Sequence, residues 1–528
     1  NSNTTAHYNT AVGNSALASN TTANNNTAVG YNALTSNTTG TNNVSIGALS
    51  LEQNTTASEN TAVGHSALEE NTTGAQNCAF GFRALEQNTT ADHNTAFGHE
   101  ALKLNTTGTQ NTAVGANALD ANTTSQRNTV VGYDAMTVNT TGNYNTAVGA
   151  YALDANNANN NVAVGDAALS SNTTGAENTA VGRYALFANS TASNNTAVGY
   201  NALYANTTGE HNTAVGRQAL KANTTGSQNG AFGYYAMDDV TTGHQNNAFG
   251  RGALGSITTQ SSNTAMGDYA LQANTAAENS AFGYRALYSN TTGTNNVAVG
   301  KNALYASTDT TECTAVGWEA LRDATADHNT ALGSKAGEET TTGASNTFIG
   351  SNAGRENTTG ARNTAMGRSA LANTTGVDDC TAIGYYACAN PTSGVSDSVF
   401  VGTSAGQEAT SANKTVCVGM NAGKYITGAD DYVFVGYNSG GNSTAITGQS
   451  NTAVGAYSLE DVTSGPHNTA IGKQALTNCT TGGYNVAIGN YALSALTDQD
   501  YLVAIGYNAL LNNTTGNRNV LIGGFAGE

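Results

Sequence analysis

Apolar positions recur along this chain with a period of 17 residues. The motif N-T-A-V-G begins at Asn9, returns at Asn26, and occurs in 31 copies or close variants, the last of which begins at Asn519. The consensus repeat is N-T-A-V-G-x-x-A-L-x-x-N-T-T-G-x-x, and its residues are numbered here as positions 1 to 17. A short fixed period predicts a repeat architecture in which each unit stacks on its neighbours.

The repeat is too short for two packed helices but fits two short strands joined by two turns. Position 5 is glycine in every copy, and an unvarying glycine predicts a backbone angle or a close approach that a Cβ would forbid. The N-T-T-G tract supplies the second turn, and stacked Asn side chains can form a hydrogen-bonded ladder. The sequence therefore predicts an all-β fold, a parallel β-solenoid of about 31 coils of about 17 residues each. The turn glycines of the first complete copies are Gly13, Gly30, Gly47, Gly64 and Gly81.

Position 4 is apolar in every copy, and we expect it to form the core row together with position 2 on the same side of the strand. Position 3 points the other way, yet it is almost always Ala and never charged. Because a strand that is dry on both faces needs a second layer, position 3 predicts packing against a neighbouring chain, and hence a homo-oligomer. A monomeric coil with a small-residue outer face is the alternative. The first members of the expected core row are Val12, Val29, Ile46, Val63 and Phe80.

Residues 333–440 form a subtype segment within what the repeat predicts to be one continuous array over residues 1–528, which starts and ends in mid-repeat. In this segment the A-L pair at positions 8 and 9 often becomes A-G or S-G. Large residues at position 3, such as Phe348, Phe400 and Phe434, cluster in the same stretch. Bulk lost at one place is restored at the other, as constant packing density requires.

Charge and composition exclude several classes of partner. Charged residues make up 10% of the chain and the formal net charge is −18, which argues against nucleic acid and anionic membranes. No apolar run approaches the roughly 18 residues that span a bilayer, so no membrane insertion is expected in this segment.

No catalytic, metal or cofactor site is expected, and the protein is predicted not to be an enzyme. The eight histidines are dispersed, and the six cysteines form no C-x-x-C pair and read as small apolar fillers. Acidic pairs such as Asp238-Asp239 occur, but the G-G-x-G-x-D calcium motif of β-rolls is absent.

Aromatic residues follow the position 5 glycine in several copies, at an outward position. They are candidates for contact with sugars or with a partner fibre, and plain surface aromatics are the alternative. The Thr columns also raise ice binding as a minor alternative. The candidate contact residues are Tyr31, Tyr133, Tyr200, Tyr284 and Trp318.

The repeats resemble those of a known family over essentially the whole chain. The sequences N-V-A-V-G (296–300), N-V-A-I-G (485–489) and S-V-F-V-G (398–402) are similar to the S-V-A-I-G strand of YadA-type trimeric autotransporter head repeats. The 17-residue form also resembles repeats of phage tail fibres, although it is two or three residues longer than the adhesin repeat.

The resemblance implies a left-handed parallel β-roll, usually trimeric, that serves as an adhesin head or fibre shaft at a cell or virion surface. The expected function is an extracellular structural fibre or stalk, with a self-assembling extracellular filament as the alternative. The expected partners are further copies of the chain, as a trimer or filament, and a host-surface glycan or receptor.

Overall fold

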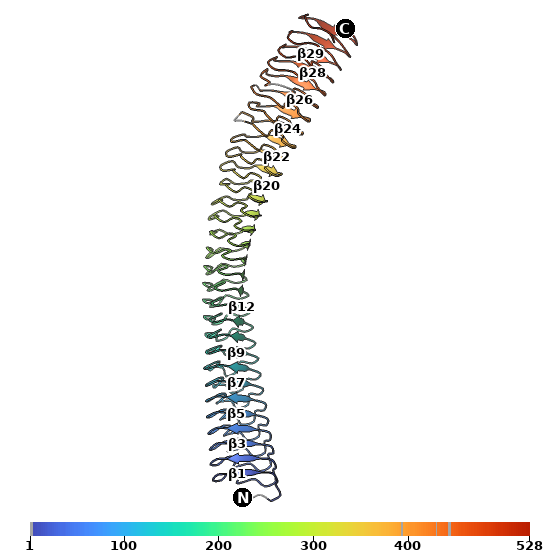
Figure 1. Ribbon diagram of the computed structural model, residues 1–528. Coiled ribbons are helices and arrows are strands. Elements are labelled where there is room, and N and C mark those ends of the chain that lie inside the picture. The colour runs from blue at the N-terminus through green and yellow to red at the C-terminus, as the bar shows by residue number, and fades with distance from the viewer. Residues whose placement is uncertain (1–3, 392–393, 429, 442–444) are drawn as a thin grey trace. The chain divides into compact units, whose positions relative to one another are not determined.

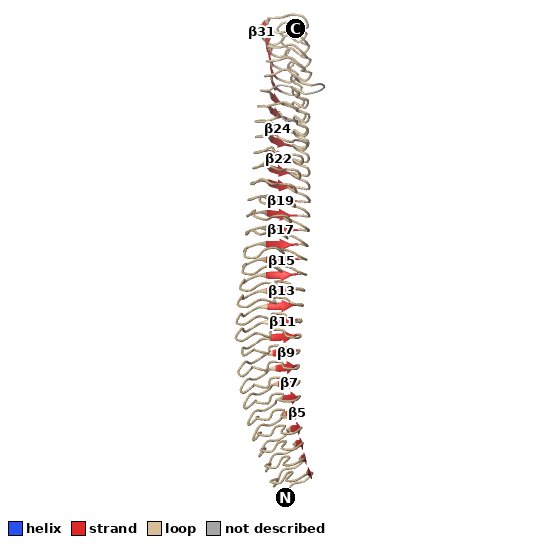
Figure 2. Ribbon diagram, turned by 90° about the vertical axis from the view of Figure 1, so that its left-hand side faces the viewer, coloured by secondary structure: helices blue, strands red, loops and turns tan. Residues whose placement is uncertain are grey.

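The computed structural model describes residues 4–391, 394–428, 430–441 and 445–528. The chain divides into two compact units, residues 1–262 and 263–528, and each is described by itself. Each unit is a parallel β-solenoid without helices among the described residues, in which every coil contributes one three-residue strand (Figures 1 and 2).

The strands occupy positions 2 to 4 of the repeat. In residues 1–262 they are β1 (Thr10–Val12), β2 (Thr27–Val29), β3 (Val44–Ile46), β4 (Thr61–Val63), β5 (Cys78–Phe80), β6 (Thr95–Phe97), β7 (Thr112–Val114), β8 (Thr129–Val131), β9 (Thr146–Val148), β10 (Val162–Val164), β11 (Thr179–Val181), β12 (Thr196–Val198), β13 (Thr213–Val215), β14 (Gly230–Phe232) and β15 (Asn247–Phe249). In residues 263–528 they are β16 (Thr264–Met266), β17 (Ser280–Phe282), β18 (Val297–Val299), β19 (Thr314–Val316), β20 (Thr330–Leu332), β21 (Thr347–Ile349), β22 (Thr364–Met366), β23 (Thr381–Ile383), β24 (Val399–Val401), β25 (Val416–Val418), β26 (Val433–Val435), β27 (Thr452–Val454), β28 (Thr469–Ile471), β29 (Val486–Ile488), β30 (Val503–Ile505) and β31 (Val520–Ile522).

Within each unit, successive strands pair in parallel and in register. Thr179, Ala180 and Val181 lie opposite Thr196, Ala197 and Val198, for example. The second strand expected in each coil does not form. The A-L segment is a turn, although it still bonds from coil to coil, as the 3.0 Å hydrogen bond from Leu34 N to Ser50 O shows.

The interior of a regular coil is small and is filled from three sides. Ala at position 3 and the A-L pair at positions 8 and 9 are buried, as in Ala62, Ala67 and Leu68. Asn at positions 1 and 12 completes the interior, and both are fully buried in most coils. The core is therefore a narrow column of small apolar groups flanked by two columns of amides.

The buried amides form the ladders that the repeat predicted. At position 1, Asn43 N donates to Asn26 Oδ1 (2.9 Å), and Asn26 Nδ2 donates to Gly40 O (2.9 Å). At position 12, Asn37 Nδ2 donates to Asn20 Oδ1 (3.1 Å) and to Gly40 O (2.9 Å). Each amide thus satisfies a carbonyl of its own coil and a neighbour along the stack, as a buried polar group requires.

The predicted core row was wrong. Positions 2 and 4 lie on the outer face of the strand, and position 3 faces the interior. Val12 is 58% exposed, Ile46 40% and Phe80 43%, whereas Ala28, Ala62 and Ala79 are fully buried. Val29 and Val63 are half-buried on the same outer face. The reason is space, because Leu and two Asn leave room for little more than a methyl group at position 3.

The position 3 residues therefore pack inside their own coil and not against another chain, which overturns the predicted role of this row. The Phe348, Phe400 and Phe434 side chains are fully buried in the same place. Any association between chains through the strands would have to use the opposite, outer face.

The predicted turn glycines are confirmed for two reasons. Gly13, Gly30, Gly47, Gly64 and Gly81 have φ between 134° and 144°, which residues with a side chain rarely adopt. In addition, a Cβ on Gly13 would overlap the carbonyl oxygen of Gly30 in the next coil. Stacking as well as turning thus fixes glycine at position 5.

The backbone conformation at position 9 explains why residues 333–440 can have glycine there in place of leucine. Leu34 has φ 52° and Leu68 53°, a left-handed conformation that costs a residue with a Cβ roughly 1–2 kcal/mol. Gly406 keeps this conformation, with φ 57°, without that cost. A Cβ at Gly406 would overlap the ring of Phe400, so the expected exchange of bulk is confirmed. Residues 392–393 and 429 of this segment lie outside the described residues.

Candidate functional site

The position 4 side chains form an exposed apolar row on the outer face of each unit, here called the outer ridge. Every strand contributes one Val, Ile, Leu, Met or Phe to it. Many of these side chains are strongly exposed, such as Phe97 at 51% and Leu332 at 49%. Neighbouring rings stack along the ridge, with centroid distances of 4.9 Å for Phe80–Phe97 and 4.6 Å for Phe232–Phe249.

The outer ridge is bordered by position 2, which is mostly Thr and otherwise Val, Cys, Ser, Gly or Asn. No strand carries a charged residue at either outward position. Solvated β-faces normally carry polar and charged groups, so an uncharged face with an apolar row differs from an ordinary surface.

Position 6, just after the turn glycine, forms a second exposed row that combines aromatic rings with cations. Arg217 lies between Tyr200 and Tyr234, with its guanidinium carbon 5.9 and 5.5 Å from the two ring centroids. His65 and His99 stack on the two sides of Phe82, at 5.6 and 5.2 Å. The row therefore presents short stacks of rings and cations, separated by small residues.

All five predicted contact residues are exposed, but they do not gather into one cluster. Tyr31 and Tyr133 are 57% and 52% exposed. Tyr200 belongs to the Arg217 stack, and Arg285 lies 5.1 Å from the ring of Tyr284. Trp318 is 47% exposed and lies 4.8 Å from Lys335 Nζ. Each is one element of the position 6 row, two or more coils from the next.

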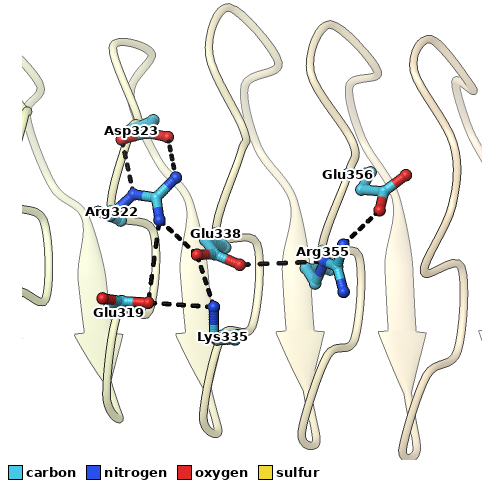
Figure 3. Close-up of polar contacts among 7 residues, drawn as sticks. All are labelled: Glu319, Arg322, Asp323, Lys335, Glu338, Arg355 and Glu356. Atoms are coloured by element: carbon cyan, nitrogen blue, oxygen red, sulfur yellow. Dashed lines mark hydrogen bonds and ion pairs between the residues drawn. The ribbon is translucent and has the colours of Figure 1, made fainter.

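Sequence reasoning missed an ion-pair network that joins three successive coils (Figure 3). Glu338, with a side chain only 4% exposed, lies at its centre. Its Oε1 lies 2.5 Å from Arg322 Nη1 and 2.9 Å from Lys335 Nζ, and its Oε2 lies 3.9 Å from Arg355 Nε. The remaining members of the network are Glu319, Asp323 and Glu356.

The network raises the pKa of both Arg322 and Lys335, chiefly through hydrogen bonds to Asp323 and Glu338 respectively. The sequence signal was present as opposite charges three residues apart (Glu319 and Arg322, Lys335 and Glu338) that recur one repeat later. With each cation facing a carboxylate, the arrangement cross-links the coils.

The acidic pairs bond locally within the solenoid. Asp378 accepts from Ala361 N (2.7 Å), and Asp379 makes two hydrogen bonds with Arg362 (2.7 and 2.6 Å). Burial, and then the neighbouring Asp239, raise the pKa of Asp238 to about 6. Over the residues that the structure describes, no group of three or more His, Cys, Asp or Glu side chains is placed to hold a metal ion.

Five of the six cysteines are buried, and Cys78 is exposed. Cys479 Sγ donates to Gly482 O (3.3 Å), which is the role of the Asn that it replaces at position 12. Burial raises the pKa of the Cys313 thiol to about 11 and that of Cys479 to about 12. These thiols are therefore protonated and unreactive at neutral pH in the folded chain.

Comparison with known proteins assigns no family. No protein-family model matches the sequence, and no curated protein matches it significantly. Among the described residues, no helix is long and apolar enough to cross a membrane.

Proposed function

We propose that the chain is an extracellular structural fibre protein, the shaft of an adhesin or of a phage-type tail fibre, in which copies of the chain associate side by side through the outer ridge. The observation that supports this is the uncharged, apolar outer face of the strands. The YadA-like and tail-fibre-like repeats motivate the surface location.

The apolar area of the outer ridge is sufficient for a specific interface. Fifteen strands of residues 1–262 each contribute one ridge side chain. At roughly 50 Å² per partly exposed side chain, this row offers on the order of 750 Å², close to the roughly 800 Å² per partner of a standard interface. The Thr row adjacent to it adds further area.

A second copy of the same chain is the occupant that fits this face. The ridge repeats once per coil, so a partner must present apolar groups with the same spacing along its length. Another solenoid of this sequence does so, and the absence of charge at positions 2 and 4 removes the like-charge repulsion that a net charge of −18 would otherwise produce. Association of identical faces also gives closed, symmetric oligomers.

Sedimentation velocity of the purified chain, with electron microscopy, tests the proposal. The wild-type chain is expected to form discrete oligomeric rods of defined mass. The double variant Val181→Glu with Val198→Glu places two carboxylates on the ridge and is expected to sediment as a monomer with an unchanged circular dichroism spectrum, because these side chains lie outside the core.

The matched control places the same charges elsewhere on the same coils. Thr191→Glu with Thr208→Glu alters exposed residues at position 14 and is expected to leave the oligomer intact. A wild-type chain that stays monomeric at all concentrations contradicts the proposal, and indefinite filaments favour the filament alternative. Thermal hysteresis from a monomeric chain would instead support ice binding by the outward Thr row.

A second candidate function is binding of a surface glycan by the position 6 row. The observation that favours it is the Tyr200–Arg217–Tyr234 stack, because exposed rings bind sugar faces and a guanidinium binds acidic sugars. Glycan-array binding that is lost in Tyr200→Ala with Tyr234→Ala, and retained in Tyr31→Ala, is the expected result. Equal loss in both variants would contradict a site at this stack.

A further inference from the structure

The two outward positions of the strands, positions 2 and 4, do not vary independently. Over the 31 strands that the structure describes, position 2 is a β-branched residue, Thr or Val, in all but four, and position 4 is Phe in five. All four exceptions at position 2 lie in strands that have Phe at position 4. A ring at position 4 is thus accompanied by the loss of the branched side chain two residues earlier. The pairs are Cys78 with Phe80, Gly230 with Phe232, Asn247 with Phe249, and Ser280 with Phe282.

The fifth phenylalanine of the outer ridge, Phe97, keeps Thr95 on its own strand. Its ring stacks on that of Phe80, with 4.9 Å between the centroids, and the strand of Phe80 carries Cys78. Every group of neighbouring rings on the ridge therefore includes at least one strand without a branched residue at position 2.

Crowding within the chain does not require this exchange. A Cβ on Gly230 would lie 3.7 Å from Cε2 of the Phe232 ring, which is an ordinary contact. Its closest neighbour, at 2.8 Å, would be Oδ1 of Asn247, the free end of an exposed side chain. Phe97 and Thr95 also share one strand. The bulk that is lost at position 2 therefore indicates room for a group outside the chain.

The orientation of a second copy decides which residues face each other. If the chains run in opposite directions, position 4 faces position 4, and most coils face a coil of different sequence. If the chains run in the same direction around an axis along the stack, each coil faces the same coil of its partner, and position 4 faces position 2. Well-packed layers place large residues opposite small ones. Only the second arrangement links positions 2 and 4 of the same strand in this way.

We propose that copies of the chain associate in parallel and in register, so that the position 4 side chain of each coil packs against position 2 of the same coil in the partner. Phe232 then lies against the partner's Gly230, and Phe80 against the partner's Cys78. Neither position carries a charge, so in-register pairing brings no like charges together across this face. The inference rests on the proposed function and adds the orientation and register of the chains to it.

Mixing two variants tests whether the exchange operates between chains. Gly230→Thr restores the branched residue beside Phe232 and should weaken self-association about tenfold through overpacking. Phe232→Val leaves a gap opposite Gly230 and should weaken it as well. When the two variants are co-expressed, one of them with a mass tag, the mixed oligomer pairs Phe with Gly and Val with Thr. Native mass spectrometry should therefore show more mixed oligomers than random pairing of the measured amounts gives.

Changes within a chain cancel in this comparison, because mixed and unmixed oligomers contain the same chains. Placing both substitutions in one chain is the matched control, and it reverses the expected result. The double variant has the Thr and Val of a regular coil and should associate with itself as the wild-type chain does. Mixed with the wild-type chain it sets Phe against Thr, so mixed oligomers should fall below the random share.

Random mixing in both experiments, with a wild-type chain that still oligomerises, would overturn the parallel, in-register pairing and leave the proposed fibre standing. A wild-type chain that stays monomeric would contradict the proposed function and this inference together. Sedimentation of the wild-type chain alone therefore separates the two failures.

Discussion

The two units use the same backbone coil but fill it differently. In residues 1–262, position 12 is Asn from Asn20 to Asn223 in every coil, and its amides bond along the stack from Asn20 to Asn139 and again from Asn156 to Asn223. In residues 263–528 the same position includes Ala, Ile, Val, Leu, Cys, Thr and Pro. The backbone bonds between coils therefore define the fold, and the interior can be polar or apolar.

At three places where the Asn column at position 12 gives way to another residue, an unpaired acceptor remains. The Oδ1 atoms of Asn223, Asn290 and Asn357 are buried without a hydrogen-bond partner. In each case the next coil carries Val, Ser or Thr in place of Asn. A buried acceptor without a partner costs about 1–3 kcal/mol, so each of these changes from one filling to the other has a local cost.

The largest effect on stability is expected from converting the Phe and Gly at positions 3 and 9 of one coil into the Ala and Leu of a regular coil. Phe400→Ala removes a fully buried ring and should lower the free energy of unfolding by about 3–5 kcal/mol. Gly406→Leu adds bulk where the ring already lies and a Cβ at positive φ, and should cost at least about 3 kcal/mol. The double variant rebuilds the Ala and Leu of a regular coil and should recover most of the loss.

Denaturant unfolding of the four chains in this double-mutant cycle measures the coupling directly. Strictly additive losses would mean that the two positions do not share one space, and would contradict the exchange of bulk between positions 3 and 9.

A smaller effect is expected from breaking a ladder. Asn88→Ala removes the amide that links Asn71 and Asn105, leaves buried partners unpaired, and should cost about 1–3 kcal/mol. Ala409→Asn, at the same position of an apolar coil, should also lower the stability of the chain. The adjacent coils have Pro391 and Ile426 at this position, so the new amide has no amide partner. Thermal unfolding of both variants checks this, and stabilisation by Ala409→Asn would show that the apolar coils tolerate a ladder.

The ion-pair network should contribute less, because most of its members are partly exposed. Glu338→Gln removes the central carboxylate from Arg322 and Lys335 and should cost about 1–2 kcal/mol. The loss should shrink in high salt, since screening already weakens the pairs in the wild-type chain. Glu339→Gln, next in sequence, half-buried and outside the network, is the matched control, and an equal loss there would contradict a specific network.

The smallest effect concerns pH at Asp238, which occupies the same repeat position as Glu338 but has no comparable cations around it. Because burial raises its folded pKa to about 6, its protonated form is favoured by folding. Its contribution is full below the unfolded pKa near 4 and is lost as pH rises through about 6. Asp238→Asn should therefore raise stability slightly at pH 7, by under about 1 kcal/mol after solvent screening, and have no such effect at pH 4.

Thermal unfolding of the wild-type chain and of Asp238→Asn at the two pH values provides the measurement. Asp239→Asn is its neighbour control. A larger stabilisation at pH 4 than at pH 7 would reverse the sign of the linkage and contradict a raised pKa at Asp238.

Repeat length, parallel stacking, the glycine at position 5 and the amide ladders could all be predicted from sequence, because each is a property of one repeat copied many times. The ion-pair network was within reach, since its charges recur at fixed spacings. The strand face that points into the core was predicted wrongly, although the sequence already showed, in Phe400 and Gly406, that a large residue at position 3 accompanies glycine at position 9. Residues at positions 3 and 9 that exchange bulk must share one interior.

The sequence by itself thus determined the coil, its register and the absence of charged residues from both strand faces. Only the tertiary structure decided which face is the core. A two-residue period separates the faces of a strand but does not say which is enclosed, whereas closure of the coil around Leu68 and the buried amides leaves space for Ala62 and sends Val63 outward. That outcome turns the presumed core row into the surface through which the fibre is proposed to assemble.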